Sequence, residues 1–352
     1  MHSYGRLFFL MLMILPGRAP AWCSDSLYVV SVAGKRGYIN HRGEMVISPQ
    51  YDYASDFSCS RALVKQGYIE QGEFQLADWG YIDPHGDEVI RPKFADGGSF
   101  FEGRAKVLLP GMGAARETYW GFIDTTGVVV VSPKYVAVGD FSDGRAWFEI
   151  KRRFLFIVLS DFFGYIDRNG AVAIPATYEQ AGNFSEGLAP IRLNGKRGYV
   201  DTSGRMVIAP TFDAGGAFSE GYAPVRVGSR WAFIDAKGTA VIPAHFDDAR
   251  SFSEGLALVR IGLRWGFVDT TGLETIPARF EELGQFSEGR APFREGRRWG
   301  FINRSGAPIV EPLYDTVWRY RGGLARVELN EQWLYIDTAG AVVWPKGFRP
   351  PH

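Results

Sequence analysis

The sequence predicts an all-β protein made of about nine tandem antiparallel β-meander repeats that stack face to face. The segment Trp265-Gly266-Phe267-Val268-Asp269 recurs along the chain, and the last five intervals between copies are each 34 residues. Aromatic residues make up 15% of the chain and 43 residues are Gly, as short strands joined by tight turns require. A fixed period in this range is the signature of a repeat architecture.

Three positions recur within each copy. The position of Trp265 is occupied in turn by Arg36, Trp79, Trp120, Phe163, Arg197, Trp231, Trp265, Trp299 and Trp333. A turn Gly follows in all nine copies, at Gly43, Gly86, Gly127, Gly170, Gly204, Gly238, Gly272, Gly306 and Gly340. A Pro lies 12 or 13 residues after the Trp position in every copy, from Pro49 to Pro345.

Turn chemistry explains these positions. Asp269-Thr270-Thr271-Gly272 suits a type I turn closed by a left-handed Gly, which is a three-residue hairpin with a bulge. The Asp side chain can cap its own turn. Pro277 lacks a backbone N–H and is therefore expected to end the strand that follows the turn.

The repeat resembles the bacterial WG-repeat family, whose Trp-Gly motif is carried here by Trp79-Gly80, Trp120-Gly121, Trp265-Gly266 and Trp299-Gly300. The resemblance covers residues 36 to 345 and implies a β-repeat array; it transfers no catalytic residues. Some copies depart from the motif, at the Trp position in Arg36, Phe163 and Arg197 and at the Gly position in Ala232 and Leu334.

Each unit is expected to contain three strands and a short fourth one. In the seventh copy these are Leu256 to Val259, Trp265 to Asp269, Leu273 to Ile276, and the short segment Arg279 to Leu283. Neither face of the second strand is polar, so the sheets must be covered on both sides. An open superhelical stack and a propeller-like ring both satisfy this. Nine units, most of them 34 residues long, favour the open stack, because propellers usually have four to eight longer blades.

Three copies carry extra residues between their first and second strands, at 65–78, 108–119 and 149–162. These insertions are expected to leave the array on one edge. The third contains the apolar run Phe154-Leu155-Phe156-Ile157-Val158-Leu159, which lengthens the hairpin or forms an exposed patch that binds a partner.

The chain divides into a signal peptide at 1–21, a repeat domain at 22–345 and a flexible Pro-rich tail at 346–352. Leu7 to Leu15 is an apolar run of nine residues, and Ala19-Pro20-Ala21 supplies a cleavage site. Trp22 disfavours the alternative of lipidation at Cys23. No other segment approaches a transmembrane length, so none is expected after cleavage.

Charge excludes nucleic acid as a partner. Removing residues 1–21 deletes Arg6 and Arg18, which leaves 39 − 2 = 37 basic and 39 acidic side chains, or a net charge of −2. Such a chain has no positive field to attract a polyanion. An exported protein with two cysteines favours a disulfide between Cys23 and Cys59, although two unpaired thiols are the alternative.

The repeated side chains are expected to be structural. The Asp column, which is Asp269 and its equivalents in the other copies, is expected to cap turns. The Glu column, which is Glu288 and its equivalents, recurs in the same way. The Trp column, which is Trp265 and its equivalents, is expected to lie in the core. We therefore predict no catalytic, cofactor-binding or metal-binding residues, and no cofactor. Trp318, Arg319 and Arg321 depart from the repeat and are the predicted binding residues, with local packing as the alternative.

These observations favour an exported, non-enzymatic binding or scaffold protein of the bacterial envelope, located in the periplasm or outside the cell. Repeat arrays present extended surfaces, so the expected partner is another protein or an envelope polymer. Carbohydrate or peptidoglycan binding through exposed aromatic residues is the alternative. An enzyme with its site in the three insertions is the less favoured third reading.

Overall fold

The computed structural model describes residues 27–65, 79–109, 119–154 and 157–348, without the side chains of 152–160. The signal peptide, Cys23 and most of the insertions at 65–78 and 108–119 lie outside the described residues. All described elements are strands, and they form nine small antiparallel sheets, here called blades 1 to 9 in chain order. Among the described residues there is no helix long and apolar enough to cross a membrane.

The blades share one strand order. Blade 1 has three strands, β1 to β3, and each later blade has four, in the order innermost, second, third and outermost. The innermost strands are β4 (Tyr53–Ala54), β8 (Asp96–Gly97), β12 (Ala137–Val138), β16 (Gln180–Ala181), β20 (Ala214–Gly215), β24 (Asp248–Ser253), β28 (Glu282–Leu283) and β32 (Thr316–Val317). The second strands are β1 (Tyr28–Val32), β5 (Ala62–Lys65), β9 (Arg104–Leu108), β13 (Arg145–Phe154), β17 (Leu188–Leu193), β21 (Tyr222–Val227), β25 (Leu256–Ile261), β29 (Ala291–Glu295) and β33 (Leu324–Leu329).

The third strands begin at or next to the Trp position. They are β2 (Lys35–Ile39), β6 (Trp79–Ile82), β10 (Trp120–Asp124), β14 (Ile157–Asp167), β18 (Lys196–Asp201), β22 (Arg230–Asp235), β26 (Arg264–Val268), β30 (Arg298–Ile302) and β34 (Gln332–Asp337). The outermost strands are β3 (Met45–Tyr51), β7 (Glu88–Phe94), β11 (Val129–Tyr135), β15 (Val172–Tyr178), β19 (Met206–Phe212), β23 (Ala240–Phe246), β27 (Glu274–Phe280), β31 (Pro308–Tyr314) and β35 (Val342–Trp344).

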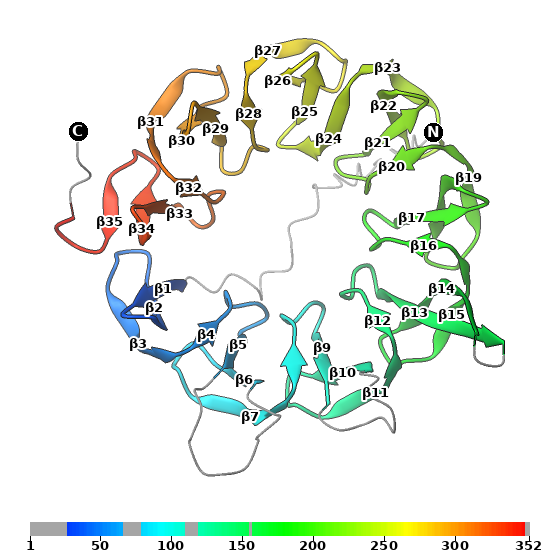
Figure 1. Ribbon diagram of the computed structural model, residues 1–352, viewed down its shortest axis with the longest axis horizontal. Helices are drawn as coiled ribbons and strands as arrows, with labels where there is room; N and C mark the ends of the chain where they lie inside the picture. Colours follow the sequence, from blue (N-terminus) through cyan, green and yellow to red (C-terminus); the bar gives the residue numbers. More distant parts are fainter. Residues whose placement is uncertain (1–26, 66–78, 110–118, 155–156, 349–352) are drawn as a thin grey trace, which may run out of the picture.

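The blades form a closed ring, so the protein is a nine-bladed β-propeller (Figure 1). Of the two arrangements that the sequence leaves open, the structure has the ring and not the favoured open stack. A 34-residue unit is long enough for a blade because the innermost strand usually has only two residues. The predicted short fourth strand exists, but as β28 it pairs with β29 of the following blade.

The core lies between the blades. One cluster joins Leu258 and Phe267 of blade 7 to Phe286 and Phe293 of blade 8, and the rings of Phe267 and Phe286 have centroids 4.6 Å apart. Equivalent clusters fill the other junctions, with the aromatic residue of each inner turn wedged against the preceding blade. Stability therefore comes mainly from contacts between neighbours.

The predicted Asp–Gly turn is confirmed. Gly272 has φ +86°, its N–H donates to the Asp269 carbonyl at 3.0 Å, and the Asp269 carboxylate accepts from the N–H of Thr271 at 2.9 Å. The Gly also touches the preceding blade, because a Cβ on Gly272 would lie 3.1 Å from Cγ2 of Ile242.

Replacing Gly272 with Val should lower the free energy of unfolding by about 1–3 kcal/mol, because a β-branched residue is strained at positive φ. Thermal melting would measure the loss. Gly289→Val is the comparison, since its φ is +74° but nothing lies within 4 Å of an added Cβ. Equal and wild-type melting of both variants would contradict the role given to these turns.

The expectation for Pro277 is wrong, because β27 continues through it from Glu274 to Phe280. The outermost strand has no neighbour on its outer side, so the missing N–H of Pro costs no ladder hydrogen bond there. A Pro on an exposed edge also opposes pairing with strands of other molecules.

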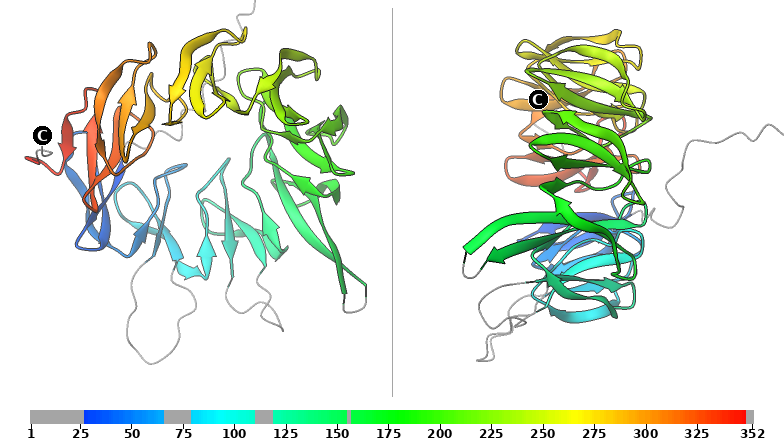
Figure 2. Two further views of the ribbon diagram at one scale, coloured as in Figure 1. Left: turned by 45° about the horizontal axis from the view of Figure 1, so that its top comes forward. Right: turned by 90° about the vertical axis from the view of Figure 1, so that its right-hand side faces the viewer.

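The two faces of the ring differ. The turn face carries the Asp–Gly turns and the inner turns that follow the innermost strands. The hairpin face is the side on which each second strand ends and each third strand begins. The strand ends that flank all three insertions lie on this side, as expected. The third insertion lengthens β13 to 10 residues and β14 to 11, and this hairpin projects beyond the ring (Figure 2).

Candidate functional site

The inner turns gather around the central axis on the turn face (Figure 1). Each is a two-residue hairpin turn, represented by Glu288 with φ +54° and Gly289 with φ +74°, between paired Ser287 and Arg290. Positive φ at both central residues defines a type I′ turn, which directs its N–H groups outward. In blades 2 to 8 the first of these two positions holds a residue other than Gly, most often Glu, so its positive φ is strained and this strain requires compensation.

Hydrogen bonds between neighbouring blades provide that compensation. In blades 3 to 8 the carboxylate of the inner turn accepts from the N–H groups of the inner turn in the next blade. Six consecutive junctions have such a bond: Glu102 with Gly144, Asp143 with Gly187, Glu186 with Gly221, Glu220 with Gly255, Glu254 with Gly289, and Glu288 with Gly323, all at 2.8–2.9 Å.

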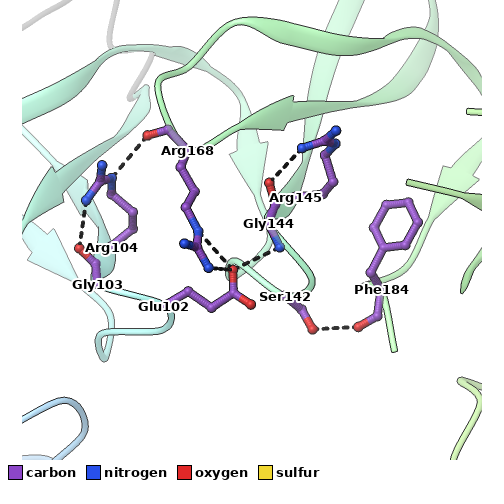
Figure 3. A network of polar contacts seen from close by, with 8 residues as sticks. All are labelled: Glu102, Gly103, Arg104, Ser142, Gly144, Arg145, Arg168 and Phe184. Carbon is purple, nitrogen blue, oxygen red and sulfur yellow. Dashed lines mark hydrogen bonds and ion pairs between the residues drawn. The ribbon is translucent and has the colours of Figure 1, made fainter. Parts of the chain in front are cut away.

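Figure 3 shows the junction between blades 3 and 4. Nη2 of Arg168 donates to the Glu102 carboxylate at 2.7 Å, beside the N–H of Gly144 at 2.9 Å. Nε of Arg104 donates to the backbone carbonyl of Arg168 at 3.1 Å. Charged side chains on the turn face thus serve the fold.

The Ser column, a Ser that precedes the Glu position of the inner turn, also forms hydrogen bonds between neighbouring blades. Ser142, for example, donates through Oγ to the Phe184 carbonyl of the next blade at 2.6 Å (Figure 3). Arg321 stands at the Ser position of blade 9. Its Nη2 donates to the Phe57 carbonyl of blade 2 at 3.0 Å, and Nη1 lies 3.4 Å from Oδ2 of Asp56. Arg321 therefore joins the end of the ring to its beginning.

Trp318 also lies where blade 9 meets blades 1 and 2, a junction here called the seam. It stands where most blades have Gly, and the Arg326 guanidinium carbon lies 4.0 Å from its ring centroid and 4.4 Å from that of Trp333. Arg36 of blade 1 extends the stack, at 5.4 Å from Trp333 and 4.5 Å from Tyr53. Arg319, which lies between Trp318 and Arg321 in the sequence, is exposed. Trp318 and Arg321 have intramolecular partners, which is the local packing that the sequence left as the alternative to binding.

Tyr335 connects blade 9 to blade 1 inside the seam. Its hydroxyl donates to the buried carbonyl of Val29 at 2.8 Å, and burial raises its pKa well above the ordinary value. Elsewhere the equivalent tyrosines donate to the carbonyl of the residue that follows the innermost strand of the next blade, as Tyr81 does to Gly98 at 2.8 Å.

Tyr335→Phe should lower the free energy of unfolding by about 1–3 kcal/mol, because the Val29 carbonyl is left buried without a donor. Denaturant titration would measure it. Tyr135→Phe is the matched control, since the Tyr135 hydroxyl is buried with no hydrogen-bond partner in the part of the chain that the structure describes. The seam assignment fails if Tyr335→Phe is no less stable than Tyr135→Phe.

The Asp column caps turns, as expected. The hydroxyl of Ser203 bonds the Asp201 carboxylate at 2.6 Å, and this bond, with others from Arg205, lowers the Asp201 pKa to about 2. The described ranges contain no group of three or more His, Cys, Asp or Glu residues that could hold a metal ion.

The side chains of the Trp column pack against the core clusters but are not buried within them, which is less burial than expected. The indoles are half-buried at the hairpin-face end of the junctions, and the neighbouring Gly is the buried member of the pair. Cationic side chains approach the indole faces, with Arg250 and Arg260 each 5.8 Å from the Trp265 centroid and Arg294 5.9 Å from that of Trp299.

The disulfide between Cys23 and Cys59 stays a prediction, because Cys23 lies outside the described residues. Cys59 occupies the Glu position of the inner turn in blade 2, with φ +51°, and its Sγ lies 3.7 Å from the Phe100 carbonyl. Mass spectrometry of the non-reduced mature protein should find the two cysteines linked; two free thiols or an acylated Cys23 would reject this.

Fold and junction chemistry define a β-propeller of short tandem repeats. The model of the WG containing repeat family matches eight segments, at 37–68, 79–109, 120–152, 163–196, 198–231, 231–262, 265–298 and 299–333. The chain belongs to this family, which confirms the resemblance carried by its Trp-Gly pairs. No curated protein matches the chain.

Solved structures with a similar shape have low sequence identity. A crystal structure of the eukaryotic initiation factor matches with 11% identity and a TM-score of 0.55, over 80% of this chain and 84% of that one. Dihydro-heme d1 dehydrogenase NirN matches with 12% identity and a TM-score of 0.45, over 94% and 75%. Apo AztD from Citrobacter koseri matches with 13% identity and a TM-score of 0.40, over 90% and 92%. At 11% identity, the match to the initiation factor shows a likeness of fold alone.

Proposed function

We propose that this protein is an exported, non-enzymatic binding scaffold of the bacterial envelope that presents the hairpin face of its propeller to a macromolecular partner. The observation that supports this most is the position of the insertions. The connections after β5 and β9 begin on the same face from which the β13–β14 hairpin projects. Variable loops on one face of a repeat scaffold are the usual place for recognition.

The use of the repeated polar groups also supports a scaffold. The Asp, Glu and Ser columns bind backbone groups of their own or the next blade, so they serve stability. Trp318 and Arg321 are engaged at the seam, and we expect them to act mainly there. The recognition surface that we propose is therefore the hairpin face and not the group of Trp318, Arg319 and Arg321.

The carbohydrate alternative would require open aromatic faces. A sugar ring stacks on the flat face of an indole, whereas here Arg or Lys side chains lie over four of the six indoles at the Trp position, those of Trp79, Trp265, Trp299 and Trp333. This arrangement favours a protein partner over a glycan.

The test is to shorten the projecting hairpin to the length found in the other blades. Replacing residues 151–161 by Asn-Gly joins Ile150 to Phe162, which already face each other across the ladder and correspond to Val227 and Arg230 of blade 6, through a two-residue turn. The shortened protein should melt as the wild type does but lose its crosslinked partner from the native envelope. Trp318→Ala is the control, because it should lower the melting temperature and retain the partner. Undiminished capture by the shortened protein would remove the hairpin as the recognition element.

Export is tested separately. Cell fractionation and N-terminal sequencing should find the protein outside the cytoplasm, beginning at Trp22. A cytoplasmic protein that retains Met1 or residues 2–21 would contradict this part of the proposal.

A further inference from the structure

One junction on the turn face departs from the chain of carboxylate bonds described above. The inner turn of blade 3, Glu102-Gly103, has the same positive φ values as the others, +50° and +74°. Its preceding blade presents Cys59 where the other junctions present Glu or Asp. Of the seven junctions between blades 2 and 9, this is the one without a carboxylate at the turn N–H groups, as far as the described residues show.

The neighbouring junction shows what the same backbone binds. In Figure 3 the N–H of Gly144 and the guanidinium of Arg168 hold the Glu102 carboxylate. One blade earlier, Gly103 corresponds to Gly144 and Thr125 corresponds to Arg168. Both members of the ion pair are therefore replaced by shorter side chains.

Positive charge remains at this position. Arg61 corresponds to Arg104 and lies in the same way, with Nε donating to the Thr125 carbonyl at 3.3 Å and Nη1 donating to the Ser60 carbonyl at 2.8 Å. Successive N–H groups of a left-handed turn form an anion-binding concavity, and a nearby guanidinium strengthens it. Cys59 carries no carboxylate as a thiol or in a disulfide.

We propose that the junction of blades 2 and 3 is a binding site for a carboxylate, formed by the N–H groups of Glu102 and Gly103 with Arg61, and that it takes an Asp or Glu side chain of a second protein. The six filled junctions support the choice of ligand, because each holds a carboxylate on a short methylene chain. The site lies on the face opposite the projecting hairpin, so it goes beyond the proposed function and is tested on the purified protein.

The experiment follows the amide signals of ¹⁵N-glycine-labelled mature protein by NMR during titration with sodium acetate, against sodium chloride of equal ionic strength. The Gly103 signal, assigned with Gly103→Asn, should shift and saturate with acetate. The Gly144 signal is the internal control and should not shift, because Glu102 already occupies its junction. A Gly103 shift no larger than that of Gly144 would overturn the site.

Two variants exchange the filled and empty junctions. Cys59→Glu, measured with reductant, should abolish the acetate response of Gly103 and raise the melting temperature, because it supplies the missing carboxylate. Glu102→Ala should make Gly144 responsive to acetate. A Gly103 response that survives in Cys59→Glu places the acetate elsewhere and overturns the proposal.

The source of the carboxylate is decided by comparing two ligands. N-acetylglutamate α-amide, which presents a Glu side chain, should bind at least threefold more tightly than glucuronate. Equal or tighter binding of glucuronate would assign the site to an acidic glycan and overturn the protein side chain as its ligand. These outcomes do not depend on the envelope partner, so failure here and failure of the proposed function remain distinguishable.

Discussion

Phe286→Ala is expected to lower the free energy of unfolding by about 3–5 kcal/mol, as truncation of a buried aromatic residue does. Phe286 is 2% exposed and its ring lies 4.6 Å from that of Phe267 across the junction of blades 7 and 8. Denaturant titration followed by tryptophan fluorescence and circular dichroism would measure the change. The loss should be large because one ring joins two blades.

Phe101→Ala is the matched control, because Phe101 is 42% exposed at an equivalent inner turn and should change stability by less than about 0.5 kcal/mol. Trp265→Ala should fall between the two, at about 1–3 kcal/mol, since its indole is only half-buried. If Phe286→Ala were no more harmful than Phe101→Ala, the junction core would not be the main source of stability.

Gly266→Leu is expected to cost about 3 kcal/mol, at the upper end of overpacking effects. A Cβ on Gly266 would lie 2.5 Å from the Ile276 carbonyl oxygen and 2.8 Å from Cα of Ala278. These are backbone atoms of the outermost strand, which must move away to admit any side chain. Thermal melting would measure the effect.

The protein contains two natural comparisons for this position. Ala232 occupies it in blade 6, so Gly266→Ala should be milder than Gly266→Leu. Leu334 occupies it in blade 9, fully buried, where the outermost strand has only three residues instead of seven. Wild-type melting of Gly266→Leu would show that close approach of the outer strand is not what requires Gly.

The repeat, the turns and the side from which the insertions leave could be predicted from the sequence, because Gly272 and its equivalents are needed for local backbone reasons. Closure of the ring could not. Closure depends on the angle between neighbouring blades. This angle follows from how Phe286 and its equivalents pack, and the repeat pattern in the sequence shows their positions but not the angle. The short innermost strands were assigned to the preceding unit, because two residues such as Glu282 and Leu283 show no alternation.

The candidate sites were harder to predict. Departures from the repeat mark Trp318 and Arg321, but the sequence does not show which residues they contact. Trp318 and Arg321 differ from their equivalents because the seam needs longer side chains, which only the three-dimensional ring shows. Cys59 was assessed as a disulfide partner, whereas its position opposite Gly103 becomes informative only when the carboxylate bonds of the other junctions are known.

The carboxylate bonds between inner turns all run in one direction, from each blade to the next along the chain. Blades 5 to 8 also share one unit length, and their junctions use the same pair of groups. Loss or duplication of one such unit by recombination within the gene would therefore create a junction of a kind that the protein already contains. Copy number can change in evolution without new interface chemistry, and the main adjustment is the angle at which the remaining blades meet.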